Sequence, residues 1–396
     1  MSSDSTPSGP ARVAFYNDPK IRSIFYQLAL LAAIAFLVYG AVSNAIENLA
    51  RANIASGFGF WNNTAGFDIS QTLISYSSQA STYGRAFWVG LLNTLLVAGL
   101  GIVFATILGF IVGLSRLSKN WLLSKVAGGF VETIRNLPLL LQLLFWYNAV
   151  LKALPDIRDS IVIPGGGMIN NRGLFLPRPE FLYGFEMVLV ALAVGVAGSI
   201  GFYIWARKRQ ERTGQQAPVA AVVLALVIGL PLAVLALKGF PLSFSYPQAG
   251  RFNIAGGVEI LPEFAALLFG LSIYTAAFIA EVVRAGVLAV SHGQVEAAYS
   301  LGLQPRPTLR LIVVPQAMRV IIPPLTSQYL NLTKNSSLAV AIGYPDLVQV
   351  FTGTVLNQTG QAVEVVAITM LVYLVISLST SLLMNIYNRR VALVER

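Results

Sequence analysis

The sequence predicts an all-α membrane protein with about eight transmembrane helices. Two observations support this fold class. Only 11% of the 396 residues are charged while 56% are hydrophobic, and the mean hydropathy is +0.69. Soluble domains carry roughly 25% charged residues, so this composition argues against a soluble enzyme or a disordered chain. The apolar residues also gather in charge-free runs close to the roughly 20 residues that a helix needs to cross a bilayer.

Eight such runs follow one another along the chain. The third is shorter than the others, and the polar hairpin Arg207–Gln216 separates the fourth from the fifth. For the first run, a cleaved signal peptide is the alternative, but its polar leader and its length favour an extra N-terminal helix over 23–46 behind a cytoplasmic tail over 1–22. The runs are Ser23–Ile46, Ala86–Ser115, Asn136–Leu151, Met187–Ala206, Ala217–Leu237, Phe264–Ala280, Leu311–Thr333 and Val365–Asn388.

The placement of basic residues predicts the orientation of these helices. If the N-terminus is cytoplasmic, 18 of the 27 Lys and Arg residues fall in segments on the inner side, as the positive-inside rule requires. Both termini are then cytoplasmic. The formal net charge of +10 therefore reflects topology, and we expect no nucleic-acid partner.

Three polar segments lie outside the membrane in this topology. They cover Asn48–Gly84, Lys152–Tyr183 and Lys238–Pro262, and none has the periodicity of an independent domain, so we expect external loops. The glycine run Gly165–Gly167 is typical of a turn and not of a nucleotide site.

The sequence lacks the residues that catalysis would need. There is no cysteine, and His292 is the one histidine, which excludes a multi-His metal cluster. No Lys is followed by Ser or Thr, so the phosphate-binding GxxxxGK[ST] motif does not occur. We therefore expect no catalytic residue, no cofactor, no metal site and no ATPase activity in this chain.

The segment between the sixth and seventh runs is unlike the other polar segments. Its spacing predicts a short helix over Gln294–Leu301 that ends at Gly302, with Ala297, Ala298 and Leu301 as an apolar stripe. A helix this short cannot bury a stripe alone. It is therefore either an ordinary amphipathic connector or a docking element for a partner.

This segment resembles the EAA loop of bacterial ABC importer permeases. The loop's spaced positions are all matched except that Val314 stands where that family has Leu. Arg135–Gln142, Tyr274–Gly286 and Lys334–Ala339 also resemble polar amino-acid permeases, and the long chain is similar to permeases of general L-amino-acid importers. The matching positions are Glu296, Ala297, Ala298, Gly302, Ile312 and Pro315.

The resemblance implies a type I ABC importer transmembrane domain over 86–388, with an inserted 153–261 segment that carries two extra helices. It implies an L-amino-acid permease subunit in a bacterial inner membrane. Its partners would be two ATPase subunits, a second, homologous but non-identical permease and a periplasmic amino-acid-binding protein. The coupling loop would cover 291–315 and meet the ATPase. The coupling residues carried over are Gly293, Glu296, Ala297, Ala298 and Gly302.

Candidate substrate contacts lie in or next to three of the predicted runs, the third, the sixth and the seventh. Glu281 and Arg284 are three residues apart and share a helix face, where they could hold the ammonium and carboxylate of an amino acid. An internal ion pair, or Arg284 reaching the lipid headgroups, is the alternative. Near Pro323 and Pro324, the seventh run is densely polar, which is typical of a translocation path or of packing between subunits. The candidate path residues are Gln142, Glu281, Arg284, Thr326, Gln328, Asn331, Asn335 and Ser336.

Two residue pairs have simpler interpretations. Glu132 and Arg135 are expected to form a helix-entry pair at the inner interface, and Gly109 and Gly113 to pack helices together. An ion-coupled carrier or channel that works alone is a rival function. A non-transporting membrane scaffold is another. The carrier would need ionisable residues near the middle of the membrane, and none of the charged residues clearly lies there.

Overall fold

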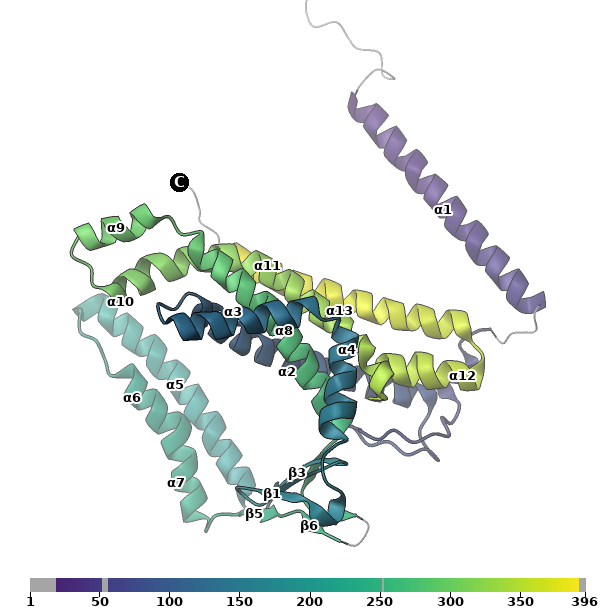
Figure 1. Ribbon diagram of the computed structural model, residues 1–396, viewed down its shortest axis with the longest axis horizontal. Coiled ribbons are helices and arrows are strands. Elements are labelled where there is room, and N and C mark those ends of the chain that lie inside the picture. Colours follow the sequence, from purple (N-terminus) through teal and green to yellow (C-terminus); the bar gives the residue numbers. More distant parts are fainter. Residues whose placement is uncertain (1–18, 52–55, 251–252, 392–396) are drawn as a thin grey trace, which may run out of the picture. The chain divides into compact units, whose positions relative to one another are not determined.

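The structure is a computed structural model that describes residues 19–51, 56–250 and 253–391 (Figure 1). Seven helical stretches in these residues are long and apolar enough to cross a membrane, and a shorter apolar stretch covers Leu139–Leu151. These eight stretches coincide with the eight predicted runs, which confirms the fold class. Most of the predicted tail over 1–22 lies outside the described residues.

Helices make up most of the described chain, and several contain π-helical or 3-10 segments that continue an α-helix. The helical elements are α1 (Pro19–Arg51), η2 (Gly59–Asn62), α2 (Tyr83–Arg116), α3 (Trp121–Asn136), α4 (Leu139–Leu144), η3 (Phe145–Leu151), η4 (Ile157–Asp159), α5 (Phe185–Thr213), α6 (Val219–Leu224), η5 (Ala225–Gly229), α7 (Leu230–Leu237), α8 (Pro262–Leu288), α9 (His292–Ser300), α10 (Pro305–Thr308), η6 (Leu309–Val313), α11 (Val314–Asn335), η7 (Ser336–Ile342), η8 (Val348–Val355), α12 (Leu356–Thr359) and α13 (Ala362–Val391).

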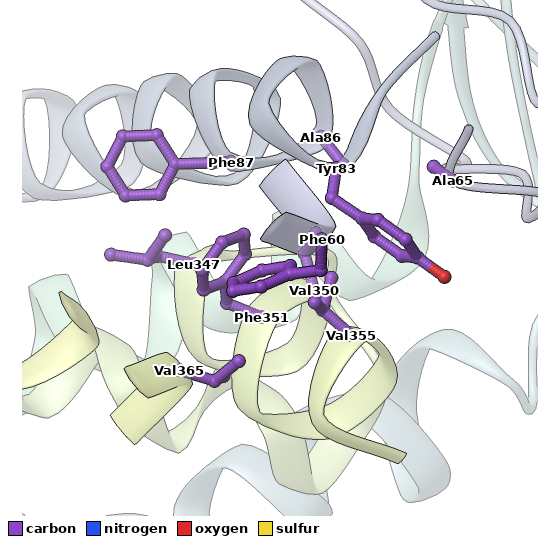
Figure 2. Packing of buried hydrophobic residues seen from close by; sticks show 10 residues of the cluster. All are labelled: Phe60, Ala65, Tyr83, Ala86, Phe87, Leu347, Val350, Phe351, Val355 and Val365. Carbon is purple, nitrogen blue, oxygen red and sulfur yellow. The ribbon is translucent and has the colours of Figure 1, made fainter. Parts of the chain in front are cut away.

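The chain divides into two compact units, with boundaries inside α2, after η7 and inside α13. The first unit comprises residues 1–93 and 345–379, and its core is rich in aromatic rings (Figure 2). The ring of Phe351 lies against those of Phe60, Trp61 and Phe87, with centroids 5.3–6.4 Å apart. These contacts join the segment before α2 to η8, so the polar stretch 48–84 is partly a packed structure and not only a loop.

The second unit comprises residues 94–344 and 380–396, and α8 lies at its centre. Helices α3, α4 and α11 pack against α8. Helix α2 also packs closely on α8, at two of its glycines. A Cβ added at Gly109 would meet Ile279, and one at Gly113 would meet Ala280 and Val283. The two glycines of α2 therefore serve helix packing, as predicted.

The external segments 152–183 and 238–262 are not simple loops, because they contain short strands that pair with one another. The sheets have the orders β1-β2-β3-β8, β4-β5 and β6-β7, and all pairs are antiparallel. Gly165 and Gly166 adopt positive φ between β1 and β2, which confirms the predicted turn. The strands are β1 (Ile161–Ile163), β2 (Gly167–Asn170), β3 (Gly173–Leu176), β4 (Arg178–Phe181), β5 (Leu242–Ser245), β6 (Gln248–Ala249), β7 (Ile254–Ala255) and β8 (Val258–Ile260).

Helices α5, α6 and α7 form a helical hairpin between β4 and β5. A Cβ at Gly195 of α5 would collide with the backbone of Leu226 in η5. The absence of a side chain at Gly195 therefore allows α5 and η5 to pack closely. Gly214, with φ of 71°, ends α5. The basic residues Arg207–Arg209 and Arg212 lie near this turn, at the opposite end of α5 from the strands.

Within the second unit, α8 separates the strands from α9. Strand β8 comes just before the start of α8, and α9 follows its end. Figure 1 shows α9 and the labelled strands β1 and β3 at opposite ends of α8. A helix of 27 residues is about 40 Å long at 1.5 Å per residue, which exceeds the hydrocarbon thickness of a bilayer. The strands and α9 are therefore on opposite sides of any membrane that α8 crosses.

Candidate functional site

Helix α9 forms where the sequence predicts a short helix, with a start two residues earlier and an end one residue earlier than expected. Gly302, with φ of 78°, ends it in the left-handed region that favours glycine. Its N–H donates to Tyr299 O at 2.9 Å, and the N–H of Leu303 donates to Ala298 O at 3.1 Å. This pair of bonds is the Schellman pattern, and it turns the chain away from the helix as predicted.

The side chains of α9 divide between an inner and an outer face. Ala298 is 1% exposed, whereas Leu301 is 82% exposed and Glu296 and Ala297 are also exposed. The expected common stripe of Ala297, Ala298 and Leu301 is therefore only partly right. Successive helical residues point about 100° apart, so Ala298 anchors the helix while Ala297 and Leu301 remain open.

The outer face of α9 also carries its charged group. Nδ1 of His292 lies 3.0 Å from Oε1 of Glu296, one turn further along. Both side chains are exposed, so this pair contributes little to stability. Together with the exposed Tyr299, these residues give α9 a mixed polar and apolar surface of the kind that contacts another protein.

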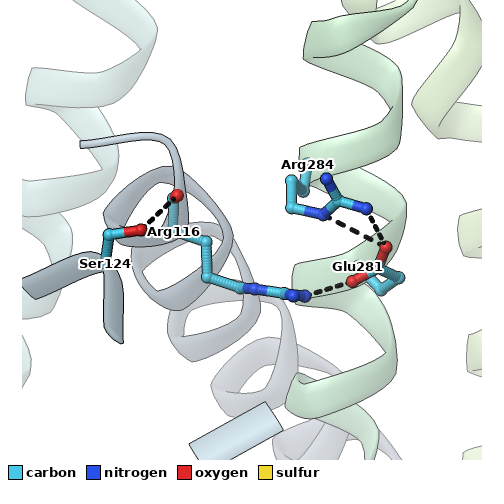
Figure 3. Close-up of polar contacts among 4 residues, drawn as sticks. All are labelled: Arg116, Ser124, Glu281 and Arg284. Atoms are coloured by element: carbon cyan, nitrogen blue, oxygen red, sulfur yellow. Dashed lines mark hydrogen bonds and ion pairs between the residues drawn. The ribbon is translucent and has the colours of Figure 1, made fainter. Parts of the chain in front are cut away.

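A cluster of three charged residues joins α2 to α8 (Figure 3). The Glu281 carboxylate accepts hydrogen bonds from Arg284, at 2.6 and 3.1 Å, and from Arg116. The side chains of Arg116, Glu281 and Arg284 are 16%, 28% and 34% exposed. The predicted shared face of Glu281 and Arg284 is therefore present, and Arg116 is a partner that sequence reasoning missed.

This geometry matches an internal ion-pair network. Both oxygens of Glu281 accept from arginines, and the backbone carbonyl of Arg116 accepts from Ser124 Oγ at 2.9 Å. The cluster ties α2, the start of α3 and α8 together near the α9 end of α8. The negative charge of Glu281 offsets one of the two positive charges of Arg116 and Arg284, in a partly buried region where an unpaired charge would be costly.

Glu132 and Arg135 are both exposed on α3, but they do not form an ion pair with each other among the described residues. The guanidinium of Arg135 instead lies over the ring of Phe278, 5.0 Å from its centroid. This cation–π contact attaches α3 to α8. The expected helix-entry pair is therefore replaced by a contact between helices.

Gln142 is buried at the junction of α3 and α4. Its Nε2 donates to the backbone oxygens of Ile134 and Leu137, at 2.9 and 3.0 Å. Pro138 has no N–H with which to continue the helix, so the side chain of Gln142 satisfies carbonyls left free at the end of α3. The structure gives this predicted path residue a local structural contact.

The polar residues of α11 and η7 fall into two groups. The hydroxyls of Thr326, Thr333 and Ser336 each donate to a backbone carbonyl three or four residues earlier. Gln328 and Asn335 are half-buried and Asn331 is exposed. In the described part of the chain, no side-chain hydrogen bond is recorded for these three amides.

One face of α11 is both polar and open. Pro324, Ser327, Asn331 and Lys334 are exposed and recur at helical spacing. The helix runs through Pro323 and Pro324 without a break. Proline lacks an N–H, so the carbonyls four residues earlier are left without their usual helical donors. A polar face of this kind is poorly suited to lipid.

The described residues contain no group of three or more His, Asp or Glu side chains placed to hold a metal ion. The charged cluster around Glu281 contains a single carboxylate.

Comparison with known proteins is consistent with these features. A model of the family of binding-protein-dependent transport system inner membrane components matches residues 105–393. The general L-amino acid transport system permease protein AapQ of Rhizobium johnstonii is 54% identical over 385 residues, which are 97% of this chain and 96% of that protein.

Two further relatives match over nearly their whole length. The putative amino-acid ABC transporter permease protein YhdX of Escherichia coli is 51% identical over 381 residues, covering 96% of this chain and 97% of YhdX. The glutamate/glutamine/aspartate/asparagine transport system permease protein BztB of Rhodobacter capsulatus is 42% identical over 428 residues, and both chains are covered completely.

Proposed function

Since this chain belongs to the family of binding-protein-dependent transport system inner membrane components, we propose that it is a permease subunit of an ATP-driven importer for L-amino acids. This proposal rests on one observation. The sequence of the chain is 42–54% identical, over 96% or more of the length of the chain, to three permeases named for amino-acid transport. The chain has no nucleotide-binding motif, so ATP hydrolysis belongs to partner subunits.

The proposed topology places α9 and the basic turn of the α5–α7 hairpin in the cytoplasm. The excess of Lys and Arg in these segments supports it. The strands and the segment before α2 then face the periplasm, and both termini are cytoplasmic. The proposed location of the chain is the bacterial inner membrane.

In the proposed mechanism, α9 transmits motion between the ATPase subunits and the membrane helices. Helix α9 packs against α10 and η6 with Ala298 buried, and Glu296, Ala297 and Leu301 are left open for a partner groove. Gly293 and Gly302 allow close approach and the turn at its end. Closure of an ATPase dimer would move α9 as a rigid body and shift the connected helices between outward-open and inward-open arrangements.

We assign the substrate path to the polar side of α11 and its surroundings. The argument is the cost of exposing this face to lipid, which a water-filled path or a second permease subunit removes. Gln328, Asn331 and Asn335 are the favoured contacts because their amides can both donate and accept. Thr326, Ser336 and Gln142 are assigned to the wall of the path, since the two hydroxyls and Nε2 of Gln142 already donate to backbone oxygens.

Glu281 and Arg284 are assigned to the inner end of the same path. Their pairing with Arg116 supports a role in closing the inner end and in holding α2 against α8. Substrate contact would require the Glu281 carboxylate to exchange one arginine for an ammonium group. The proposed partners are two ATPase subunits, a second permease that is homologous and non-identical, and a periplasmic amino-acid-binding protein.

The test is reconstitution of this chain with the ATPase, permease and binding protein of its own transport system in lipid vesicles. Uptake of labelled L-amino acids should need ATP on the ATPase side and the binding protein on the other side. Vesicles that lack the ATPase are the control. Uptake by this chain alone, driven by a sodium or proton gradient, would instead establish the ion-coupled carrier.

A further inference from the structure

A polar pocket in the first unit has no part in the coupling or the path proposed above. Its volume is about 640 Å³. Two stretches far apart in the sequence line it, one before and at the start of α2, the other from α12 to the start of α13. The polar side chains around it are Ser56, Asn63, Thr64, Tyr83, Gln358 and Gln361.

The wall of this pocket is held in place by specific contacts. The hydroxyl of Tyr83 donates to Oε1 of Gln358 at 3.0 Å, which joins the two stretches. Phe60 is 4% exposed and belongs to the aromatic core behind the pocket. One side of the pocket therefore belongs to the packed core of the first unit.

Two buried acceptors, one on the lining residue Gln361 and one on Glu364 outside the lining, have no donor among the described residues. Gln361 is 8% exposed, and its Oε1 accepts no hydrogen bond. Oε2 of Glu364, one helical turn further along α13, is also buried without a donor. The other oxygen of Glu364 accepts from the backbone N–H of Gly57, next to Ser56 in the lining. Buried acceptors without donors are uncommon and costly, so they favour a bound group that donates.

The charge around the pocket indicates what kind of donor it takes. The described residues of the lining include no Lys or Arg, whereas the carboxylate of Glu364 binds Gly57, next to the lining residue Ser56. Hydroxyl and amide oxygens supply further acceptors. A primary ammonium group offers three donors and a positive charge, and so matches two orphan acceptors of which one is anionic.

On the basis of the proposed function and topology, we propose that this pocket binds a primary ammonium group at the periplasmic face. Two sources share that chemistry. One is a free amino acid that waits outside the path, and the other is a lysine side chain of the binding protein that delivers the substrate. A water-filled pocket is the alternative outcome.

The test uses the complete complex in nanodiscs and the variant Gln361→Leu, which removes one acceptor at similar volume. Gln79→Leu is the matched control, because Gln79 is exposed in the same segment before α2. In one arm, calorimetry measures binding of a free amino acid and of its N-acetyl derivative. In the other, it measures binding of the binding protein with native or acetylated lysines.

We expect Gln361→Leu to weaken binding about tenfold in one arm, which corresponds to about 1.4 kcal/mol. Acetylation of the ammonium group should weaken binding by a similar factor in that arm. The control variant Gln79→Leu should leave binding unchanged in both arms. The arm that responds identifies the source. Unchanged binding in both arms would overturn the proposal and leave water as the occupant.

A second variant covers the case in which Gln361→Leu does not fold. Gln361→Glu adds a negative charge at the same place and should tighten binding of the ammonium; unchanged or weaker binding by the folded variant would contradict the proposal. Uptake by the same wild-type complex is measured in parallel. Absence of ATP-driven uptake would refute the proposed function, whereas normal uptake without a response to either variant would refute only the pocket.

Discussion

The guanidinium of Arg116, the last residue of α2, forms an ion pair with the carboxylate of Glu281 on α8 (Figure 3). The two residues are 165 positions apart in the chain. Since Glu281 also binds Arg284, a single carboxylate pairs with two arginines where α2 ends. We therefore expect the Glu281 carboxylate to contribute mainly to the packing of α2 on α8.

The first prediction concerns this carboxylate. Glu281→Gln should lower the stability of the purified complex by about 2 kcal/mol, because two partly buried arginines lose their counter-charge. Thermal unfolding in detergent measures the effect. Glu211→Gln is the control, since the pair of Arg207 with Glu211 is exposed and its loss should shift the midpoint little. An unchanged midpoint with a raised half-saturation concentration for substrate would instead favour direct substrate contact.

The second prediction concerns coupling. Glu296→Lys should leave insertion and folding intact, because this side chain is exposed, but uptake should fall tenfold or more as a like charge enters the partner interface. Uptake in reconstituted vesicles is the measurement. Glu211→Lys makes the same charge change on the basic turn of the α5–α7 hairpin and should transport normally. Equal uptake by both variants would remove Glu296 from the coupling surface.

The third prediction concerns the end of α9. Gly302→Ala should cost about 1 kcal/mol, because alanine is strained at a φ of 78°. Coupling between ATP hydrolysis and uptake should weaken, since α9 loses its fixed end. The ratio of ATP hydrolysed to amino acid transported reports this change. Gly128→Ala lies in helix α3 with open space around its Cα and should keep the ratio of the wild type.

The fourth prediction concerns helix packing. Gly113→Ala should destabilise the second unit by about 1–3 kcal/mol, because a Cβ would lie 2.7 Å from Ala280 O and 2.9 Å from Val283 Cβ. Thermal unfolding and the yield of folded protein measure this. Gly99→Ala on the same helix meets nothing within 4 Å and should be neutral or slightly stabilising. Equal midpoints for the two variants would contradict the close contact of α2 with α8.

The fifth prediction concerns pH. Asp346 lies in the segment between the last two spans, is fully buried and accepts from the N–H of Gln349 and the hydroxyl of Tyr373. Burial raises the pKa of Asp346 to about 7. The folded state thus holds a proton that the unfolded state releases near pH 4. The stabilisation that comes from this proton on Asp346 is complete below about pH 4 and is lost as the pH rises through about 7.

The unfolding midpoint should accordingly be higher at pH 5 than at pH 8, and Asp346→Asn should reduce the difference. Thermal unfolding of both proteins across this range is the measurement. Glu47→Gln is the control, because Glu47 is exposed and should leave the pH profile as it is. A profile for Asp346→Asn identical to that of the wild type would assign the pH dependence to other groups.

Most of the helical fold could be predicted from sequence because hydropathy acts locally. Each span carries its own apolar run, so the start of α8 at Pro262 lies two residues from the predicted one. The end of α9 was also predictable, since Gly302 is a strong local signal for a left-handed residue. The EAA spacing pointed to the family that the comparisons support.

Contacts between distant segments could not be predicted in the same way. The strands β3 and β8 have four and three residues, too few for a clear alternating pattern, and they come from two segments separated by the α5–α7 hairpin. Arg116 follows the second apolar run directly, and nothing in the local sequence connects it to Glu281, 165 positions away. The burial of Ala298 but not Ala297 depends on where α10 and η6 return to α9.

The pairing of β4 with β5 has a practical consequence. The chain enters and leaves the α5–α7 hairpin through two adjacent strands, so the hairpin is attached at a single base. A rigid fiducial domain grafted at Gly214, in the turn at its tip, would leave that base untouched. Electron microscopy of such a fusion would reveal the position of the hairpin in the assembled transporter while the core machinery keeps its native sequence.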